Sequence, residues 1–109
     1  MLMKVTSEVY ENGRGEIAVL VSPGWGAGWS TWERPELAYD KFVVELFLEY
    51  QEGKVSEEEV EKKLEKRYNK SIYMGGWSDL VIEWMPRGEP FQIIEYDGSE
   101  YINREFLEF

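Results

Sequence analysis

The chain has 109 residues, of which 43% are hydrophobic and 16% aromatic, and its formal net charge is −10. These values predict one folded domain over residues 1–109 and argue against disorder, membrane association and direct binding to nucleic acid. The sequence has no cysteine and no histidine, which removes disulfides, thiolate catalysis, the commonest general base and the commonest ligands of transition metals. We therefore expect neither a metal nor a cofactor.

The first predicted elements are two strands joined by a tight turn. Residues 5–10 are rich in β-branched and aromatic side chains, which favour a strand. Asn12-Gly13 is the strongest short hairpin signal. Residues 17–21 form a continuous apolar run of strand length. We expect this second strand to be buried on both faces and to pair antiparallel with the first.

A helix is predicted over residues 40–52, because apolar side chains recur there at positions i, i+3, i+4 and i+7. Gly53 follows it as a candidate C-cap. Pro35 and Glu36, a few residues earlier, indicate either a helix start or a turn leading to a start at Asp40.

The second predicted helix begins after Ser56, which forms a capping box with Glu59 and leads into a helix ending near residue 69. Its inward-facing stripe is narrow, so this helix should lie at the surface and form an αα-hairpin with the first. The stripe consists of Val60, Leu64 and Tyr68.

Three further strands are predicted in the last third of the chain. Residues 80–85 and 90–96 read as strands separated by a tight turn, and Asp97-Gly98 is a second hairpin signal. Residues 101–109 alternate like an edge strand or a frayed end. The resulting order, ββααβββ, predicts an α+β fold in which a helix pair packs on one face of a mostly antiparallel sheet.

The most unusual stretch is the glycine- and tryptophan-rich loop SPGWGAGWSTW at residues 22–32. Its indoles favour stacking on a base or ring, although they could instead plug the end of the core. A phosphate loop is disfavoured because neither a following Lys nor the G-x-G-x-x-G spacing is present. Arginines outside the second helix are the scarce cations that a phosphate would need. The candidate ligand-binding residues are Trp25, Gly26, Gly28, Trp29, Ser30, Thr31, Trp32, Trp77, Arg34 and Arg104.

The acidic residues are unevenly spread. Residues 54–70 hold six Lys/Arg and five Asp/Glu, whereas the rest of the chain holds six Lys/Arg and seventeen Asp/Glu. A dense acidic surface can occupy the groove of a basic protein, or it can serve solubility alone. No pair of carboxylates is singled out for hydrolysis, and a nucleophile at Ser30 would lack a histidine base. We therefore expect that the protein is not an enzyme.

Four segments, residues 6–17, 23–32, 35–41 and 94–100, resemble a family of small proteins of about this length carried by tailed bacteriophages and prophages; the run GAGWSTW at 26–32 is the most specific part. The resemblance implies a phage accessory protein made in the cytoplasm of the host bacterium. Small accessory proteins of this kind often blunt host defence. The resemblance carries no catalytic residue.

Three functions remain open from the sequence. The first is capture of a nucleotide-type immune signal in an aromatic, glycine-rich pocket. The second is inhibition of a basic host defence protein by an acidic surface, as an anti-CRISPR protein does. The third is a structural or morphogenetic phage protein without a small ligand, for which we expect a homo-oligomer.

Overall fold

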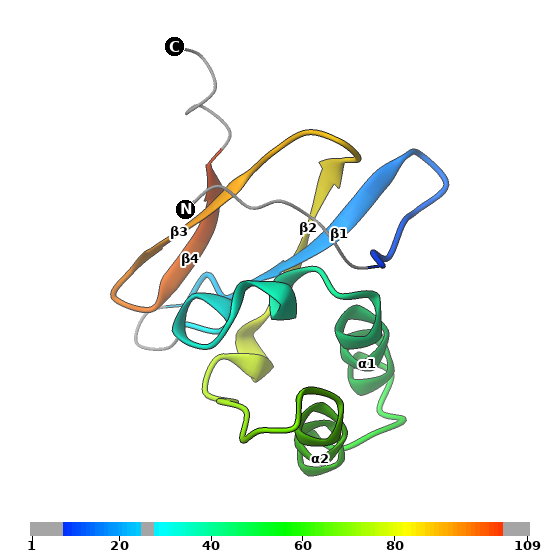
Figure 1. Ribbon diagram of the computed structural model, residues 1–109, viewed down its shortest axis with the longest axis vertical. Coiled ribbons are helices and arrows are strands. Elements are labelled where there is room, and N and C mark those ends of the chain that lie inside the picture. The colour runs from blue at the N-terminus through cyan, green and yellow to red at the C-terminus, as the bar shows by residue number, and fades with distance from the viewer. Residues whose placement is uncertain (1–7, 25–27, 104–109) are drawn as a thin grey trace.

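The computed structural model describes residues 8–24 and 28–103. Within these residues the chain forms two α-helices and two small antiparallel sheets, which confirms the predicted α+β class (Figure 1). Three short 3-10 helices are η1 (Ser30–Trp32), η2 (Pro35–Ala38) and η3 (Trp77–Asp79). The main elements, in chain order, are β1 (Glu16–Val21), α1 (Lys41–Gln51), α2 (Glu57–Tyr68), β2 (Val81–Pro86), β3 (Gln92–Tyr96) and β4 (Ser99–Asn103).

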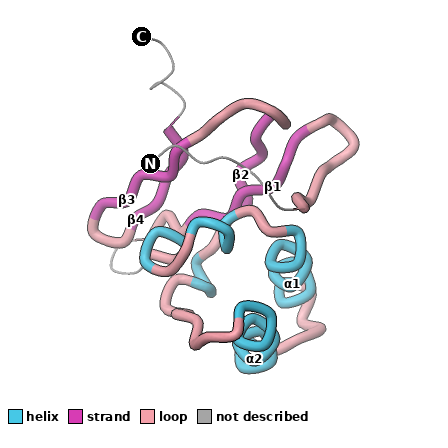
Figure 2. The backbone as a smooth tube through the Cα atoms, in the orientation of Figure 1, coloured by secondary structure: helices cyan, strands magenta, loops and turns pink. Residues whose placement is uncertain are grey.

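Both helices begin and end where the sequence signals predict. The Asp40 side chain caps α1 by accepting a hydrogen bond from the Phe42 N–H, and Gly53 follows the helix with a φ of +76°. Helix α2 has the complete capping box, in which Ser56 and Glu59 exchange two hydrogen bonds of 3.1 Å. Figure 2 shows the two helices next to each other on one side of the strands.

The strand expected over residues 5–10 is reduced to isolated bridges in its described part. Val9 pairs with Asp40 and Glu11 pairs with Ile17, both antiparallel, while residues 5–7 lie outside the described residues. The Asn12 side-chain oxygen accepts hydrogen bonds from two backbone N–H groups of the turn. A turn therefore forms at the predicted place, but its positive φ lies at Gly15 and not at Asn12 or Gly13, so it is not the two-residue Asn-Gly turn that the signal favours.

The expected single sheet is wrong, because the strands divide into two pairs. Strand β1 pairs antiparallel with β2, and β3 pairs antiparallel with β4. Strand β2 ends at Pro86, which has no N–H to donate, and the chain then turns through Gly88 with a φ of +90°. The second hairpin turns at Asp97 and Gly98, both with positive φ, as a two-residue hairpin turn requires.

Strand β1 lies between two hydrophobic clusters and is buried on both faces, as the sequence predicts. Ala18 and Leu20 point into the cluster that contains the helices, whereas Ile17, Val19 and Val21 point into the cluster that contains Phe91 and Met85. Alternate residues of a strand face opposite sides, so one short strand serves both clusters. The β3–β4 hairpin contacts the chain just after the end of β1, where the Glu100 N–H donates a hydrogen bond of 2.6 Å to the Ser22 carbonyl.

Candidate functional site

The predicted ligand loop connects β1 to η2, and the structure divides its side chains between the core and the surface. Trp29 has no exposed surface and Ser30 is 2% exposed, whereas Trp32 is 46% exposed. The predicted site residues Trp25, Gly26 and Arg104 lie outside the described residues.

Trp29 and Trp77 form the centre of the helical cluster. Their rings meet edge to face with centroids 5.4 Å apart, and Trp77 makes similar contacts with Phe47 and Tyr50. Both indoles are 0% exposed, and among the described residues neither indole N–H has a hydrogen-bond partner. A ring without exposed surface stacks no ligand unless the core opens, so these two tryptophans are core residues in this structure.

The glycines of this region allow two segments of backbone to touch. A Cβ atom at Gly76 would lie 2.4 Å from the carbonyl oxygen of Gly28, closer than real Cβ contacts. A Cβ at Gly28 would lie 3.0 Å from the Trp32 ring. The close approach therefore accounts for both glycines by packing within the chain, without a ligand.

A buried carboxylate that sequence reasoning missed holds the loop in place. Glu100, 1% exposed on β4, accepts hydrogen bonds from the backbone N–H groups of Ser22 (3.0 Å), Trp29 (2.8 Å) and Thr31 (3.0 Å). It also accepts from the Thr31 hydroxyl. The predicted ligand donor Thr31 is thus engaged by the chain itself, and Ser30 is buried. The loop does bind an anion through its peptide groups, but that anion is the protein's own side chain.

Among the described residues of the loop, Trp32 is the exposed aromatic side chain, and with Tyr73 it forms an aromatic shelf. Their ring centroids lie 5.6 Å apart at an angle of 38°. The Tyr73 ring occupies the space into which a side chain at Gly75 would project. The Tyr73 N–H donates to Glu33, the residue after Trp32, and Lys70 pairs with the same carboxylate. The segment after α2 is therefore held against η1, with one indole open to solvent.

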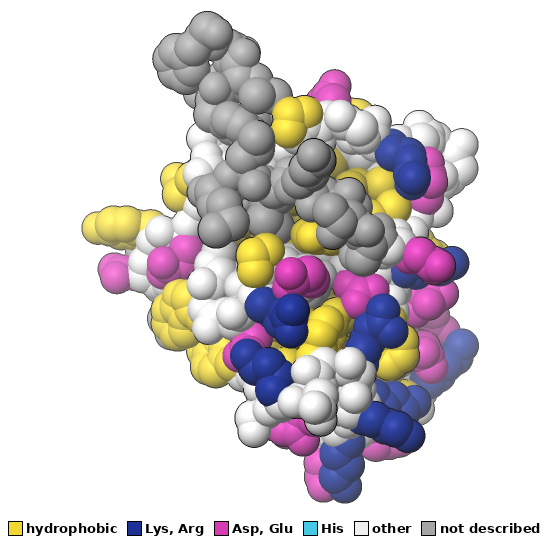
Figure 3. All heavy atoms as spheres, viewed as in Figure 1, with side chains coloured by type: hydrophobic (Ala, Val, Ile, Leu, Met, Phe, Trp, Pro, Cys, Tyr) yellow, Lys and Arg dark blue, Asp and Glu magenta, His cyan; other side chains and the backbone are white. Residues whose placement is uncertain are grey.

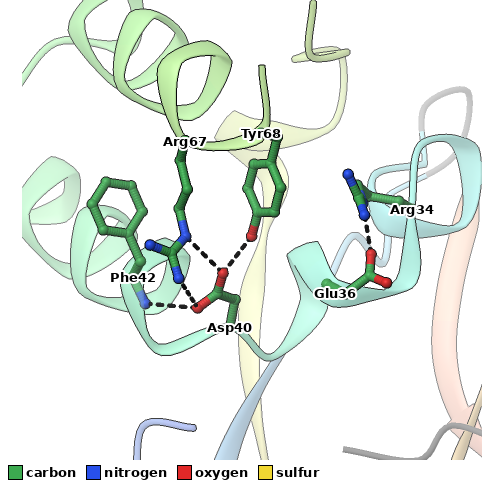
Figure 4. Close-up of polar contacts among 6 residues, drawn as sticks. All are labelled: Arg34, Glu36, Asp40, Phe42, Arg67 and Tyr68. Carbon is green, nitrogen blue, oxygen red and sulfur yellow. Dashed lines mark hydrogen bonds and ion pairs between the residues drawn. The ribbon is translucent and has the colours of Figure 1, made fainter. Parts of the chain in front are cut away.

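Two cationic side chains lie near the ring of Tyr68, the last residue of α2. The Arg34 guanidinium lies 5.0 Å from the Tyr68 ring centroid, and that of Arg67 lies 5.9 Å from it (Figure 4). Arg67 also donates two hydrogen bonds to Asp40, and the Tyr68 hydroxyl donates to the same carboxylate. Arg34 pairs with Glu36 at 2.6 Å. The side chain of Asp40 is only 5% exposed and that of its partner Arg67 is 41% exposed, so solvent meets mainly the cation of this pair. In the other pair Arg34 and Glu36 are 37% and 39% exposed, so solvent meets both charges.

The tyrosine and the carboxylates of this surface have shifted pKa values at Tyr68, Glu36 and Glu33. Burial raises the pKa of Tyr68 well above its usual value of 10, and the hydrogen bond to Asp40 acts in the same direction. The hydrogen bond from Arg34 lowers the pKa of Glu36. Burial alone would raise the pKa of Glu33, but hydrogen bonds from Lys70 and the Tyr73 N–H outweigh it and lower the pKa. Tyr68 is therefore a protonated donor and both carboxylates are ionised at neutral pH.

The cations occupy a limited part of the surface. On the face in Figure 3, Lys and Arg side chains gather over the helical half, with a smaller group at the upper right. Of the predicted ligand residues, the structure brings Trp32 and Arg34 to this surface. The structure also shows Arg67, Tyr68 and Tyr73 here, which the sequence analysis did not predict as site residues. The signal in the sequence that could have indicated them is the basic and aromatic composition at and after the end of α2.

Other kinds of site find no support in the described part of the chain. No helix there is long and apolar enough to span a membrane. Residues 8–24 and 28–103 contain no group of three or more acidic, cysteine or histidine side chains that could hold a metal ion. Comparisons with protein-family models, with curated proteins and with solved structures found no match for this chain.

Proposed function

We propose that this protein is a non-enzymatic phage accessory protein that captures a nucleotide-type immune signal in the cytoplasm of its bacterial host. The observation that carries the proposal is the exposed Trp32 indole, which meets the Tyr73 ring at a tilt of 38° and lies two residues before Arg34. An aromatic face and a guanidinium are the two groups that recognise a base and a phosphate. The phage and defence context comes from the sequence resemblance described above.

The shelf differs from the pocket expected from the sequence. Trp29 and Trp77 are buried in the core, and Trp32 offers the exposed indole. The ligand's phosphate would meet Arg34, Arg67 and Lys70, each of which is more than one-third exposed. This placement matters because a chain of net charge −10 repels an anion everywhere except near its cations.

Isothermal titration calorimetry with a panel of cyclic mono-, di- and oligonucleotides tests the proposal. We expect at least one of them to bind and to be recovered unchanged. Trp32→Ala should weaken binding by about 5- to 150-fold, the equivalent of the 1–3 kcal/mol of one base stack. If the protein in the calorimeter cell is folded and no nucleotide of the panel gives a heat of binding, the proposal is wrong.

A matched pair of arginine variants tests the phosphate contact. Arg34→Gln should lower the affinity for the nucleotide and leave the affinity for the same base without phosphate unchanged, because the guanidinium binds the phosphate. Arg87→Gln removes the same charge from an exposed ion pair with Glu11, outside the surface around Tyr68. Equal losses in the two variants would assign the effect to net charge and contradict a local phosphate contact.

A second candidate function is inhibition of a basic host defence protein. The acidity outside residues 54–70 favours it, since seventeen Asp/Glu stand there against six Lys/Arg. Such binding should weaken steeply with salt. A titration of the complex from about 0.1 to 0.5 M salt, spanning Debye lengths of roughly 10 to 4 Å, separates it from nucleotide capture at the shelf.

A further inference from the structure

The guanidinium of Arg34 is held by two neighbouring side chains. Its Nε–H donates a hydrogen bond of 2.6 Å to Glu36, and its central carbon lies over the Tyr68 ring, 5.0 Å from the centroid. Figure 4 shows one nitrogen of Arg34 directed at Glu36, while the far end of the guanidinium points away from it. A ring and a carboxylate both restrict a long side chain that otherwise has many rotamers. The guanidinium is therefore oriented before any ligand arrives.

The two outer nitrogens of Arg34 are unused. Within residues 8–24 and 28–103 the hydrogen-bond and ion-pair partner of Arg34 is Glu36, which takes the Nε–H, so neither Nη atom has a partner there. The two Nη atoms of a guanidinium form a planar fork that matches two oxygens of a phosphate. Arg34 therefore has a free fork that is fixed at its base, on a side chain that is 37% exposed.

The neighbouring cations are engaged differently. Arg67 uses both Nε and Nη2 to bind the Asp40 carboxylate, at 3.0 and 3.2 Å, and that carboxylate is only 5% exposed. Lys70 lies 2.5 Å from Glu33, whose side chain is 10% exposed. A phosphate that took over either cation would leave a largely buried carboxylate without its partner, which is costly. Of these three cations, Arg34 is the one that can bind two phosphate oxygens and keep its own partner.

We propose that Arg34 is the phosphate-binding residue of this surface, and that Glu36 and Tyr68 are positioning residues that fix its Nη fork in advance. This inference rests on the proposed capture of a nucleotide and names the group that binds the ligand's phosphate. The charge of Glu36 repels a phosphate, whereas its hydrogen bond orders the guanidinium and so lowers the ordering cost of binding. The two effects of Glu36 on affinity have opposite signs, and a substitution shows which of them is larger.

The test follows the guanidinium signals of the arginines by nuclear magnetic resonance while pyrophosphate is added to the full chain. It is done at about physiological salt, where a Debye length of roughly 8 Å screens most of the net charge of −10. We expect the largest change at Arg34 and smaller changes at the exposed residues Arg14 and Arg87. Equal changes at all three would show unspecific attraction to cations and overturn the inference.

Substitutions of Glu36 test the positioning role. Glu36→Ala should weaken pyrophosphate binding about 2- to 12-fold, because the ordering cost of one flexible side chain returns. Glu36→Gln should restore at least the wild-type affinity, since its amide oxygen still accepts the Nε–H and the repelling charge is gone. Glu83→Ala removes an exposed carboxylate from β2 and should change the affinity by less than about 2-fold. Tighter binding by Glu36→Ala than by wild type would overturn the positioning role.

A second matched pair tests the fork itself. Arg34→Lys keeps the positive charge and removes the two parallel donors, so it should weaken pyrophosphate binding at least about 5-fold. Arg87→Lys makes the same change in the exposed ion pair with Glu11, and the affinity should stay within about 2-fold of wild type. Wild-type affinity in Arg34→Lys would show that a point charge is enough and would contradict the fork. Circular dichroism and urea midpoints confirm that each variant is folded.

The outcomes separate this inference from the proposed function. If pyrophosphate changes the Arg34 signals and no nucleotide of the panel binds, the phosphate site stands and nucleotide capture is wrong. If a nucleotide binds and pyrophosphate leaves the Arg34 signals unchanged, this inference is wrong, and nucleotide capture rests on the Trp32 indole alone. Absence of a response to both ligands would overturn both.

Discussion

Two buried carboxylates hold this acidic chain together, and they are neutralised in different ways. Asp40, 3% exposed, receives two hydrogen bonds from the Arg67 guanidinium, one from the Tyr68 hydroxyl and one from a backbone N–H. Glu100, 1% exposed, receives three from backbone N–H groups and one from the Thr31 hydroxyl. The partners of Glu100 that the described residues supply are all neutral dipoles.

The difference shows what a glycine-rich loop contributes to a protein of net charge −10. Peptide N–H groups that converge on one point stabilise a carboxylate without a cation, and their geometry is fixed by the fold. At the other site the Arg67 guanidinium stabilises the Asp40 carboxylate with a full positive charge on a long side chain that is 41% exposed to solvent. The two sites should therefore respond differently to substitution and to salt.

The largest effect is expected from Glu100→Gln. The new amide N–H₂ group would face either Ser22 N–H or the donors of Trp29 and Thr31, leaving buried donors opposed to one another. We expect a loss of about 2–4 kcal/mol in the free energy of unfolding, measured with urea. Glu83→Gln, an exposed carboxylate on β2, should change stability by less than about 0.5 kcal/mol. Equal losses in the free energy of unfolding for the two variants would show that the hydrogen bonds from the loop to Glu100 contribute nothing to stability.

A smaller effect is expected from Asp40→Asn. Asparagine keeps the cap on α1, and Arg67 is 41% exposed, so water can hydrate the guanidinium that loses its partner. The free energy of unfolding should fall by about 1–2 kcal/mol. Addition of about 0.5 M salt, which shortens the Debye length to roughly 4 Å, should narrow the gap to wild type, whereas the gap for Glu100→Gln should stay constant. Identical salt responses would contradict the distinction between the sites.

The smallest effect appears at alkaline pH. Because burial and Asp40 raise the pKa of Tyr68 in the folded chain, an unfolded chain releases this proton first, near pH 10. The stability due to Tyr68 is therefore fully present below pH 10 and is lost as the pH rises further. Wild type should lose up to about 1.4 kcal/mol per pH unit relative to Tyr68→Phe in that range. Urea unfolding at a series of pH values measures this, and parallel curves would contradict it.

The helices follow from neighbouring residues, which is why sequence analysis predicts them well. The capping box of α2 joins Ser56 to Glu59, three positions away, and Gly53 ends α1 with the backbone conformation that glycine favours. The apolar run of β1 likewise predicts burial on both faces. In each case the cause and the structure lie within one short segment.

The pairing of strands and the function of the loop follow from contacts between distant residues. Local patterns predict five strands but do not show that β3 leaves the β1–β2 ladder after Pro86. The sequence offers 22 acidic residues, and nothing near Glu100 marks it as the one that binds the loop. An indole is equally suited to a core and to a ligand, so burial of Trp29 and exposure of Trp32 could not be predicted from composition.

The distance along the chain between Ser22 and Glu100, 78 positions, also sets an order of events during synthesis. A ribosome releases the loop and both helices well before it releases β4. The helices, whose bonds are local, can form early, whereas the peptide groups of the loop wait for an acceptor that is made after both helices. In a nascent chain that stops before β4, the peptide N–H groups of Ser22, Trp29 and Thr31 lack the Glu100 acceptor, so the loop stays open to chaperones and proteases until the hairpin is made.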